Sequence, residues 1–326
     1  MKRCLVLGSG SFAAALAHVL KRRGAEVTML CRREERAEEL RRGEHGSLPG
    51  VTLASGLEAT TELDPNREFH FGLSVVPTQR LRSVLEARGD FLPRGLPWIS
   101  ASKGIEIGTG LRPSEILAEF DLDPSPMVLS GPSHAEEVAL DVPTAVVLAG
   151  SDAERAGLLQ EQFSGERFRV YVNSDPIGVE WAGALKNVIA LASGIAVGQG
   201  FGDNTLAALI TRGAVEIARF GVALGGQRDT FHGLSGIGDL IVTCFSDHSR
   251  NRSVGVRLGR GESVEDVVGN MTQVAEGVPT TRAVVERARQ LGVELPIAEE
   301  VFRIVHEGAD VTTGVEALLS RSLKSE

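Results

Sequence analysis

A lysine and an asparagine stand side by side in a long apolar stretch that is rich in small residues. Lys186 and Asn187 follow Ala182 and Gly183 by one helical turn, and Ala190 comes one turn later. These small neighbours share a helical face with Lys186, so a ligand or another backbone can approach it closely. A desolvated amine can exchange a proton near neutral pH, whereas a guanidinium stays charged. Because the chain has only five lysines among 34 basic residues, Lys186 is a candidate acid–base group. The alternative is a lysine at a helix–helix contact that reaches out to solvent.

A glycine-rich turn near the N-terminus could hold phosphate groups. It joins an apolar run at Arg3–Leu7 to a helical pattern at Ser11–Arg23. In the G-x-G-x-x-G/A pattern, the glycines let the backbone turn sharply, and the pyrophosphate of a dinucleotide lies on the helix N-terminus. A small third residue lets the helix pack closely on the strand. The expected cofactor contacts are Gly8, Gly10, Ser11, Phe12 and Ala13.

Arginines follow the second apolar run, where the ribose of a dinucleotide would lie. The sequence reads Cys31-Arg32-Arg33, and acids come only at Glu34 and Glu35. An acid at this place accepts from the ribose 2′-hydroxyl of NAD, whereas an arginine favours the 2′-phosphate of NADP. We therefore expect NAD or NADP as the cofactor, with NADPH used well through Arg32 and Arg33. The alternative is a solvated, charged start of a helix.

The elements that position these residues alternate between apolar runs and helical patterns in the first half of the chain. Such alternation predicts a mostly parallel, doubly wound α/β sheet. The expected strands are Arg3–Leu7, Glu26–Leu30, Phe71–Val76, Trp98–Ala101, Met127–Leu129, Thr144–Leu148 and Phe168–Val172.

After Asn173 the pattern becomes helical. Ser174 or Asp175 can cap a helix whose first turn contains Pro176. We expect an α/β domain over residues 1–174 and an all-α domain over residues 175–326. The expected helices are Pro176–Val197, Thr205–Leu224, Val264–Val268, Thr280–Gln290, Ile297–Glu307 and Gly314–Ser322.

Composition excludes several classes of protein. The 326 residues are 42% hydrophobic and 24% charged, which is typical of a globular protein of two domains. With a net charge of −9 and no basic stripe, we expect no nucleic-acid partner. We expect no signal peptide and no membrane span, because no window approaches about 18 apolar residues. Three distant cysteines predict buried thiols in a cytoplasmic protein, with neither a disulfide nor a metal site; they are Cys4, Cys31 and Cys244.

Seven short motifs occur along the chain, and the first three follow predicted strands at the edge where ligands bind in such sheets. They are Val76-Pro77-Thr78, Ser102-Lys103-Gly104-Ile105-Glu106, Ser130-Gly131-Pro132-Ser133-His134-Ala135, Leu185-Lys186-Asn187-Val188, Gly200-Phe201-Gly202-Asp203-Asn204, Gly238-Asp239-Leu240 and Ser249-Arg250-Asn251-Arg252. Together they resemble the bacterial-type glycerol-3-phosphate dehydrogenase family over nearly the whole chain. The resemblance implies a Rossmann-like domain, an all-α domain and a homodimer. It also implies hydride transfer between NAD(P)H and dihydroxyacetone phosphate, supplying sn-glycerol 3-phosphate for phospholipid synthesis.

The resemblance assigns roles to the charged residues of these motifs. Lys186 is the proton-transfer group, and Asn187 helps to orient the substrate or the proton path. Lys103 contacts substrate and cofactor, with a surface-loop lysine as the alternative. Arg250 and Asn251, together with Ser249, look like the phosphate grip, and family members also use this arginine against the cofactor. Arg252 has a simpler alternative, a pair with nearby acids.

The remaining candidates are smaller or less specific. Asp239 could accept from a substrate hydroxyl or hold Lys186 in position; the alternative is a helix N-cap. Thr243, one turn later, is a weaker candidate for substrate contact. Gly131 and Ser133 could donate to the substrate, or could form an ordinary Ser-Gly-Pro turn. His134 is not expected to be the base. The expected cofactor contacts also include Ala135, Val274 and Glu276.

Two other functions compete with this one. The first is a related dehydrogenase of the same plan, acting on a 3-hydroxyacid or on 6-phosphogluconate. The second is a non-catalytic NAD(P)H sensor that retains the fold. The Ser-Lys-Gly, Ser-Gly-Pro-Ser and Ser-Arg-Asn-Arg runs argue against the first. The presence of Lys186, Asp239 and Arg250 argues against the second.

Overall fold

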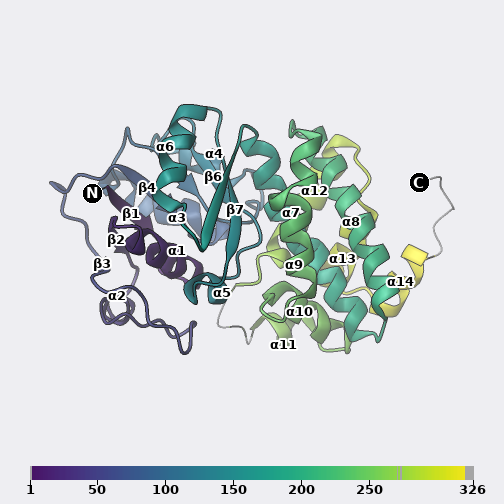
Figure 1. The fold of residues 1–326 in the computed structure, drawn as a ribbon. Coiled ribbons are helices and arrows are strands. Elements are labelled where there is room, and N and C mark those ends of the chain that lie inside the picture. The colour runs from purple at the N-terminus through teal and green to yellow at the C-terminus, as the bar shows by residue number, and fades with distance from the viewer. Residues whose placement is uncertain (1, 270, 272–273, 320–326) are drawn as a thin grey trace. The chain divides into compact units, whose positions relative to one another are not determined.

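The computed structural model describes residues 2–269, 271 and 274–319. The chain divides into two compact units (Figure 1). One contains Met1–Lys103 and Leu111–Glu180, and the other contains Gly104–Gly110 and Trp181–Glu326. The division between Glu180 and Trp181 falls inside a single helix.

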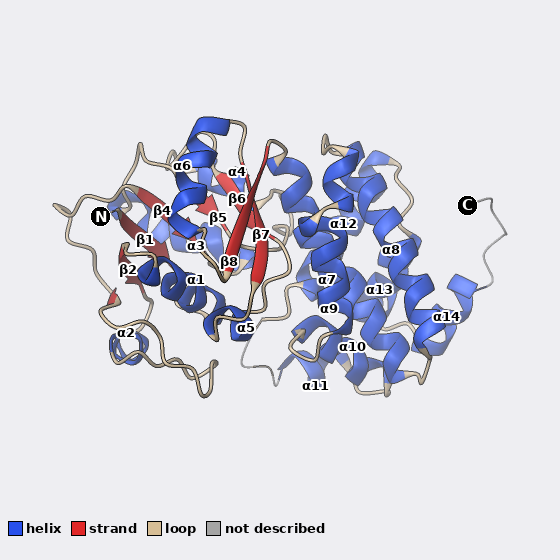
Figure 2. Cartoon of the chain, in the orientation of Figure 1, coloured by secondary structure: helices blue, strands red, loops and turns tan. Residues whose placement is uncertain are grey.

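The first unit is built on one eight-stranded sheet in the order β3-β2-β1-β4-β5-β6-β7-β8 (Figure 2). Neighbouring strands are parallel, except that β6 and β7 are antiparallel. The predicted doubly wound α/β fold is therefore confirmed. The strands are β1 Arg3–Leu7, β2 Glu26–Leu30, β3 Glu58–Thr60, β4 Phe71–Ser74, β5 Trp98–Ser100, β6 Met127–Ser130, β7 Thr144–Ala149 and β8 Phe168–Asn173.

Helices cover both faces of this sheet. Cys4 and Val6 of β1 pack into one hydrophobic cluster, whereas Leu5 and Leu7 pack into a second cluster. This alternation follows from the strand geometry, in which successive side chains point to opposite faces. Helices α1, α2, α5 and α6 contribute to the first cluster, and α3 and α4 contribute to the second. The helices are α1 Ser11–Arg22, α2 Glu34–Arg41, α3 Thr78–Arg88, α4 Pro113–Glu119, α5 Ala135–Ala139 and α6 Ala153–Phe163.

In the described part of the second unit the regular elements are all helices, as predicted (Figure 2). The sequence did not predict α9 and α10 as separate helices. The last helix begins three residues earlier than the predicted Gly314–Ser322, and the last three residues of that prediction lie outside the described residues. The helices are α7 Pro176–Gly198, α8 Asp203–Ala223, α9 Asp239–Phe245, α10 Arg250–Gly259, α11 Val264–Gly269, α12 Gly277–Leu291, α13 Pro296–Glu307 and α14 Val311–Leu319.

Helix α7 corrects one expectation. The helix is long and apolar enough to span a membrane, so the expectation that no segment of the chain has the apolar length of a membrane span was wrong. However, 89% of its apolar window is buried inside the protein. A long helix that is hydrophobic all round is also typical of the centre of a large fold, and the burial supports that interpretation here.

Glycines allow α7 and α10 to pack backbone against backbone. A Cβ at Gly194 would lie 2.1 Å from the carbonyl oxygen of Arg252, and a Cβ at Gly255 would lie 2.2 Å from that of Leu191. One turn on, Gly198 and Gly259 repeat the pattern, since a Cβ on either would approach the opposite backbone within 2.4 Å. This contact aligns the start of α10 with the middle of α7.

The three cysteines are free and buried, as predicted.

Candidate active site

The glycine-rich turn between β1 and α1 has the backbone that a phosphate group needs. Gly8 has a φ of +123°, and a Cβ there would lie 2.8 Å from the carbonyl oxygen of Val75. A Cβ at Gly10 would meet no atom within 4 Å, so the approach to this backbone is open. Gly10 is the N-cap of α1, and neither a side-chain cap nor an acid occupies the first turn. The loop therefore fits the pyrophosphate of a dinucleotide.

Two further residues of the G-x-G-x-x-G/A pattern are explained by their packing. Ala13 is fully buried in the cluster that joins α1 to β1, which agrees with the expected need for a small residue. Ser11 opens α1 and is also buried.

A histidine that the sequence did not single out supports this loop. His45 Nε2 donates to the carbonyl oxygen of Ser9 at 3.1 Å, and His45 Nδ1 accepts from the backbone N–H of Ser47 at 3.1 Å. A neutral imidazole donates from one nitrogen and accepts at the other, so these bonds specify the neutral ring. Burial lowers the pKa of His45 from its ordinary value, which also favours the neutral form.

The end of β2 leads into an exposed pair of arginines. The side chains of Arg32 and Arg33 have no hydrogen-bond or ion-pair partner among the described residues, and Arg33 is the N-cap of α2. The nearest acid, Glu34, pairs with Arg41 at 2.5 Å and accepts from the hydroxyl of Thr61 at 3.2 Å. The acid that could accept from a ribose hydroxyl is thus already bonded.

Lys103 lies among other predicted residues of the first unit. Its Nζ donates to the carbonyl oxygen of Gly131 at 2.9 Å and lies 5.8 Å from the centre of the Phe12 ring. The hydroxyl of Ser133 donates to the same carbonyl at 2.9 Å, which closes the Ser-Gly-Pro turn. Gly131 has a φ of +138°, a conformation that favours glycine. Turns after β5 and β6 therefore meet the first turn of α1, and Lys103 is half-buried there.

The middle of α7 carries a buried ion pair. Lys186 Nζ donates to Asp239 Oδ1 at 2.5 Å and to the hydroxyl oxygen of Thr243 at 2.7 Å. The side chains of Lys186 and Asp239 are 8% and 1% exposed, so the lysine does not reach out to solvent. Asp239 is the first residue of α9 and Gly238 is the N-cap, so the N-cap alternative for Asp239 is wrong. Thr243 in turn donates to the carbonyl oxygen of Asp239 at 2.6 Å.

A π-helical turn places Asp239. It spans Leu234–Gly238 and runs directly into α9. A Cβ at Gly236 would lie 2.0 Å from the carbonyl oxygen of Phe231, so only glycine fits there. Cys244 follows on α9, and burial raises its pKa to about 12. Its thiol therefore stays protonated near neutral pH.

Asn187 and Asn251 join three helices of the second unit. Asn251 Nδ2 donates to Asn187 Oδ1 at 2.8 Å, and Asn251 Oδ1 accepts from the N–H of Gly277 at 2.9 Å. A Cβ at Gly277 would lie 2.6 Å from the carbonyl oxygen of Asn187. The start of α12 therefore sits directly on α7 and α10. The sequence did not indicate this role of Gly277.

The start of α10 carries the remaining cations. Ser249 is its N-cap and accepts from the N–H of Arg252 at 3.3 Å. Arg250 Nη1 donates to the carbonyl oxygen of Val274 at 3.0 Å. Arg252 pairs with Asp247 at 2.8 Å, as its alternative expected.

The other two predicted contacts occupy helix starts. Ala135 opens α5 and is buried, and Glu276 is the N-cap of α12. The described residues thus form two groups, one within each compact unit. The first lies around the glycine-rich turn and after β2, β5 and β6, and the second lies on α7, α9, the start of α10 and the segment before α12.

Two family models match most of the chain. The NAD-dependent glycerol-3-phosphate dehydrogenase N-terminus matches residues 3–156, and the C-terminus of the same family matches residues 175–316. The chain belongs to the NAD-dependent glycerol-3-phosphate dehydrogenase family.

Individual members of the glycerol-3-phosphate dehydrogenase family agree over nearly the whole length. Glycerol-3-phosphate dehydrogenase [NAD(P)+] from Moorella thermoacetica is 50% identical, over 97% of this chain and 95% of its own. The enzyme of that name from Geobacter sp. is 46% identical, over 100% of this chain and 99% of its own. The crystal structure of glycerol-3-phosphate dehydrogenase from Coxiella burnetii has a TM-score of 0.92 at 36% identity, covering 98% of this chain and 99% of that one. These matches favour this family over the related dehydrogenases considered above.

Proposed function

We propose that this protein interconverts dihydroxyacetone phosphate and sn-glycerol 3-phosphate by hydride transfer with NAD(P)H. The observation that carries the proposal is the buried Lys186–Asp239 pair on α7 and α9, in a chain of the glycerol-3-phosphate dehydrogenase family. A sensor that only bound the cofactor would have no need of a buried ammonium, because a buried ion pair costs desolvation energy.

The first unit provides the cofactor contacts in this proposal. The open backbone at Gly10 and the uncapped first turn of α1 would hold the pyrophosphate, and Ala135 would lie nearby. Bound NAD(P)H would supply the hydride that reduces the carbonyl carbon of the substrate. Lys103, held by the Gly131 carbonyl and the Phe12 ring, would place a positive charge near substrate and cofactor.

Lys186 would manage the proton. When the ketone is reduced, its oxygen takes a proton from the Lys186 ammonium; in oxidation, the neutral amine takes the hydroxyl proton back. Asp239 at 2.5 Å stabilises the ammonium, and Thr243 fixes its direction. Asp239 therefore acts through the lysine in this scheme.

The start of α10 would bind the phosphate. Arg250 supplies the guanidinium, which can contact two phosphate oxygens at once. Ser249 caps the helix that carries it, and the Asn187–Asn251 bond holds that helix against α7. Val274 and Glu276, which flank the Arg250 contact and the start of α12, would border the cofactor.

The wider assignments follow from the same scheme. We assign residues 1–174 to cofactor binding and residues 175–326 to substrate binding and catalysis. The bonded Glu34 and the unpaired Arg32 and Arg33 support the use of NADPH. The protein would act as a cytoplasmic homodimer on a small phosphate substrate and supply glycerol 3-phosphate for phospholipid synthesis.

Absorbance at the reduced-nicotinamide band tests the reaction. Purified protein with dihydroxyacetone phosphate should oxidise NADPH or NADH, and Lys186→Ala should lower kcat by about 10²- to 10⁴-fold. Lys21→Ala, a matched change in the last turn of α1, should keep wild-type activity. Binding of NADPH, followed by its fluorescence, should persist in both variants and shows that they fold. Wild-type protein that binds NADPH without turnover would favour the sensor instead.

A further inference from the structure

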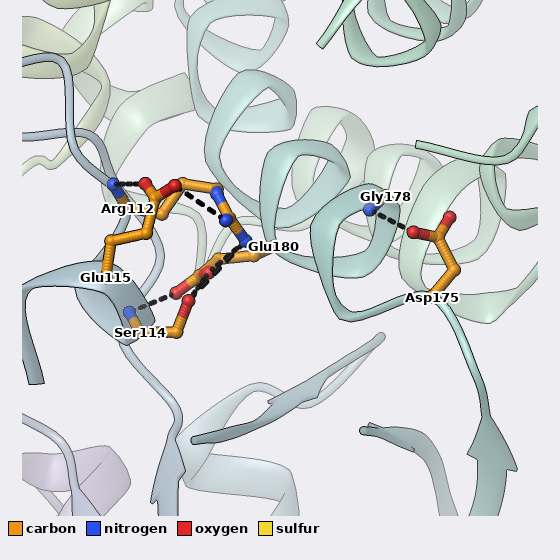
Figure 3. A network of polar contacts seen from close by, with 6 residues as sticks. All are labelled: Arg112, Ser114, Glu115, Asp175, Gly178 and Glu180. Atoms are coloured by element: carbon orange, nitrogen blue, oxygen red, sulfur yellow. Dashed lines mark hydrogen bonds and ion pairs between the residues drawn. The ribbon is translucent and has the colours of Figure 1, made fainter. Parts of the chain in front are cut away.

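A buried carboxylate fastens the first turns of α7 to the start of α4. The Glu180 side chain is 0% exposed. Its Oε1 accepts from the backbone N–H of Ser114 at 2.9 Å, and its Oε2 accepts from the Ser114 hydroxyl at 2.5 Å. Arg112 Nη1 adds an ion pair to Oε2 at 3.1 Å. Figure 3 shows the carboxylate facing both residues.

The residues that receive Glu180 are themselves fixed. Arg112 is the N-cap of α4, and its backbone N–H and its guanidinium both bond to Glu115 at 2.8 Å. Ser114 is the second residue of α4, after Pro113, so its N–H has no partner within the helix. Glu180 therefore caps α4 from outside and ties two helices together.

The start of α7 is also held on its other side. Asp175 Oδ1 accepts from the N–H of Gly178 at 2.8 Å, which is the capping bond expected before Pro176 (Figure 3). The helix then continues without a break to Gly198. Lys186 follows Glu180 by six residues, which is about 9 Å along the axis.

The desolvation cost of burying Glu180 suggests that its carboxylate orients α7 and does more than anchor the helix. Burial raises the pKa of the Glu180 carboxyl, and the bonds from Arg112 and Ser114 only partly offset that burial. Apolar side chains would anchor a helix without this desolvation cost, but they would not fix its rotation and register as hydrogen bonds do.

We propose that Glu180 is a positioning residue for proton transfer: its bonds to Ser114 and Arg112 fix the first turn of α7 and, through the unbroken helix, the place of the Lys186 ammonium. The inference rests on the proposed role of Lys186. Glu180 touches neither the lysine nor the cofactor loop within the described contacts, so its effect must travel along the helix.

Replacing Glu180 by glutamine should distinguish an effect on the position of Lys186 from an effect on the binding of NADPH. Glu180→Gln removes the ion pair and one acceptor, so we expect kcat to fall by about 10- to 100-fold, the order that a misplaced group costs. KM for NADPH should stay within about twofold, because the glycine-rich turn is unchanged. The primary isotope effect with deuterated NADPH should rise, since the chemical step becomes slower than product release.

Glu216 provides a matched control. It is buried on α8 and accepts from the N–H of Ile297 at 2.8 Å, the second residue of α13 after Pro296. Glu216→Gln should lower the unfolding midpoint comparably and leave kcat and the isotope effect unchanged. If Glu180→Gln does not fold, Ser114→Ala removes one donor and should lower kcat in the same direction by a smaller factor.

The outcomes distinguish this inference from the proposed function. Equal kcat and isotope effects in Glu180→Gln and Glu216→Gln, with wild-type turnover intact, would overturn the positioning role alone. A fall in kcat accompanied by an equal rise in KM for NADPH would likewise contradict it. Wild-type protein that fails to reduce dihydroxyacetone phosphate would remove the proposed function as well.

Discussion

At the residue scale, the cofactor preference should depend on two arginines. Arg32 and Arg33 are exposed after β2, and neither is engaged by the described residues, whereas Glu34 is bonded to Arg41. Replacing both by serine should lower kcat/KM for NADPH by about tenfold or more, because charged contacts of this kind contribute about 1.5–3 kcal/mol. The efficiency with NADH should change little.

Steady-state kinetics with both cofactors measures this preference. Arg42→Ser, at the other end of α2, is the control and should leave the NADPH/NADH ratio unchanged. If both cofactors lost efficiency equally in the double variant, Arg32 and Arg33 would be merely a solvated helix start.

Single residues also show how far the sequence could predict the site. Lys186 stood out because the chain otherwise prefers arginine and because small residues surround the lysine. The choice for Asp239 between a helix cap and a partner of Lys186 needed the structure, since the two residues are 53 positions apart. The bond from His45 to Ser9 crosses 36 positions and has no local pattern at all.

At the element scale, the packing of α7 on α10 depends on glycine. A Cβ at Gly255 would lie 2.2 Å from the carbonyl oxygen of Leu191 and 2.8 Å from the backbone nitrogen of Ile195. Gly255→Ala should therefore lower the free energy of unfolding by about 1–3 kcal/mol, as overpacking does. It should also reduce kcat, because Asn251 on α10 would move away from Asn187.

Urea unfolding and turnover measure these two effects. Gly157→Ala in the interior of α6 is the control, since a Cβ there would meet no atom within 4 Å. That change should be neutral or stabilising by about 1 kcal/mol, because alanine is the better helix former. A Gly255→Ala variant as stable as wild type would show that the two helices can separate at little cost.

The sequence predicted elements that are long or buried on both faces. β1 and β2 were predicted with their observed bounds, and both are buried over four of their five residues. β3 has three residues at the sheet edge and too little burial for a pattern. α10 is rich in arginine and glycine, so its sequence has no clear apolar pattern. Its buried face includes glycines that pack against the backbone of α7, a contact that the local sequence does not indicate.

At the scale of the whole molecule, burial of histidines should make stability depend on pH. Burial lowers the pKa of His18, His45 and His306 from the ordinary value of 6.5. His18 Nδ1 accepts from the N–H of Ala54 at 2.9 Å, and His45 Nδ1 accepts from that of Ser47 at 3.1 Å. Protonation of either nitrogen would break its bond.

The sign follows from proton uptake. Below pH 6.5 the unfolded histidines bind protons more readily than the folded ones, so the free energy of unfolding falls as the pH falls towards the folded pKa values. Glu180 acts in the opposite direction, because its raised pKa makes the folded state take up a proton above pH 4.5. Because three histidines lose stability on acidification and one carboxyl gains it, we expect the free energy of unfolding to fall as the pH is lowered.

Thermal unfolding between pH 7 and pH 5.5 measures this loss. The wild-type midpoint should fall across that range, whereas a His18→Asn, His45→Asn double variant should start lower at pH 7 and show a flatter curve, because two of the three groups no longer titrate. A steeper curve in the double variant would mean that those rings are protonated in the folded state.

The same variant lacks the His45 bond to Ser9, so KM for NADPH should rise at every pH if that bond shapes the glycine-rich turn.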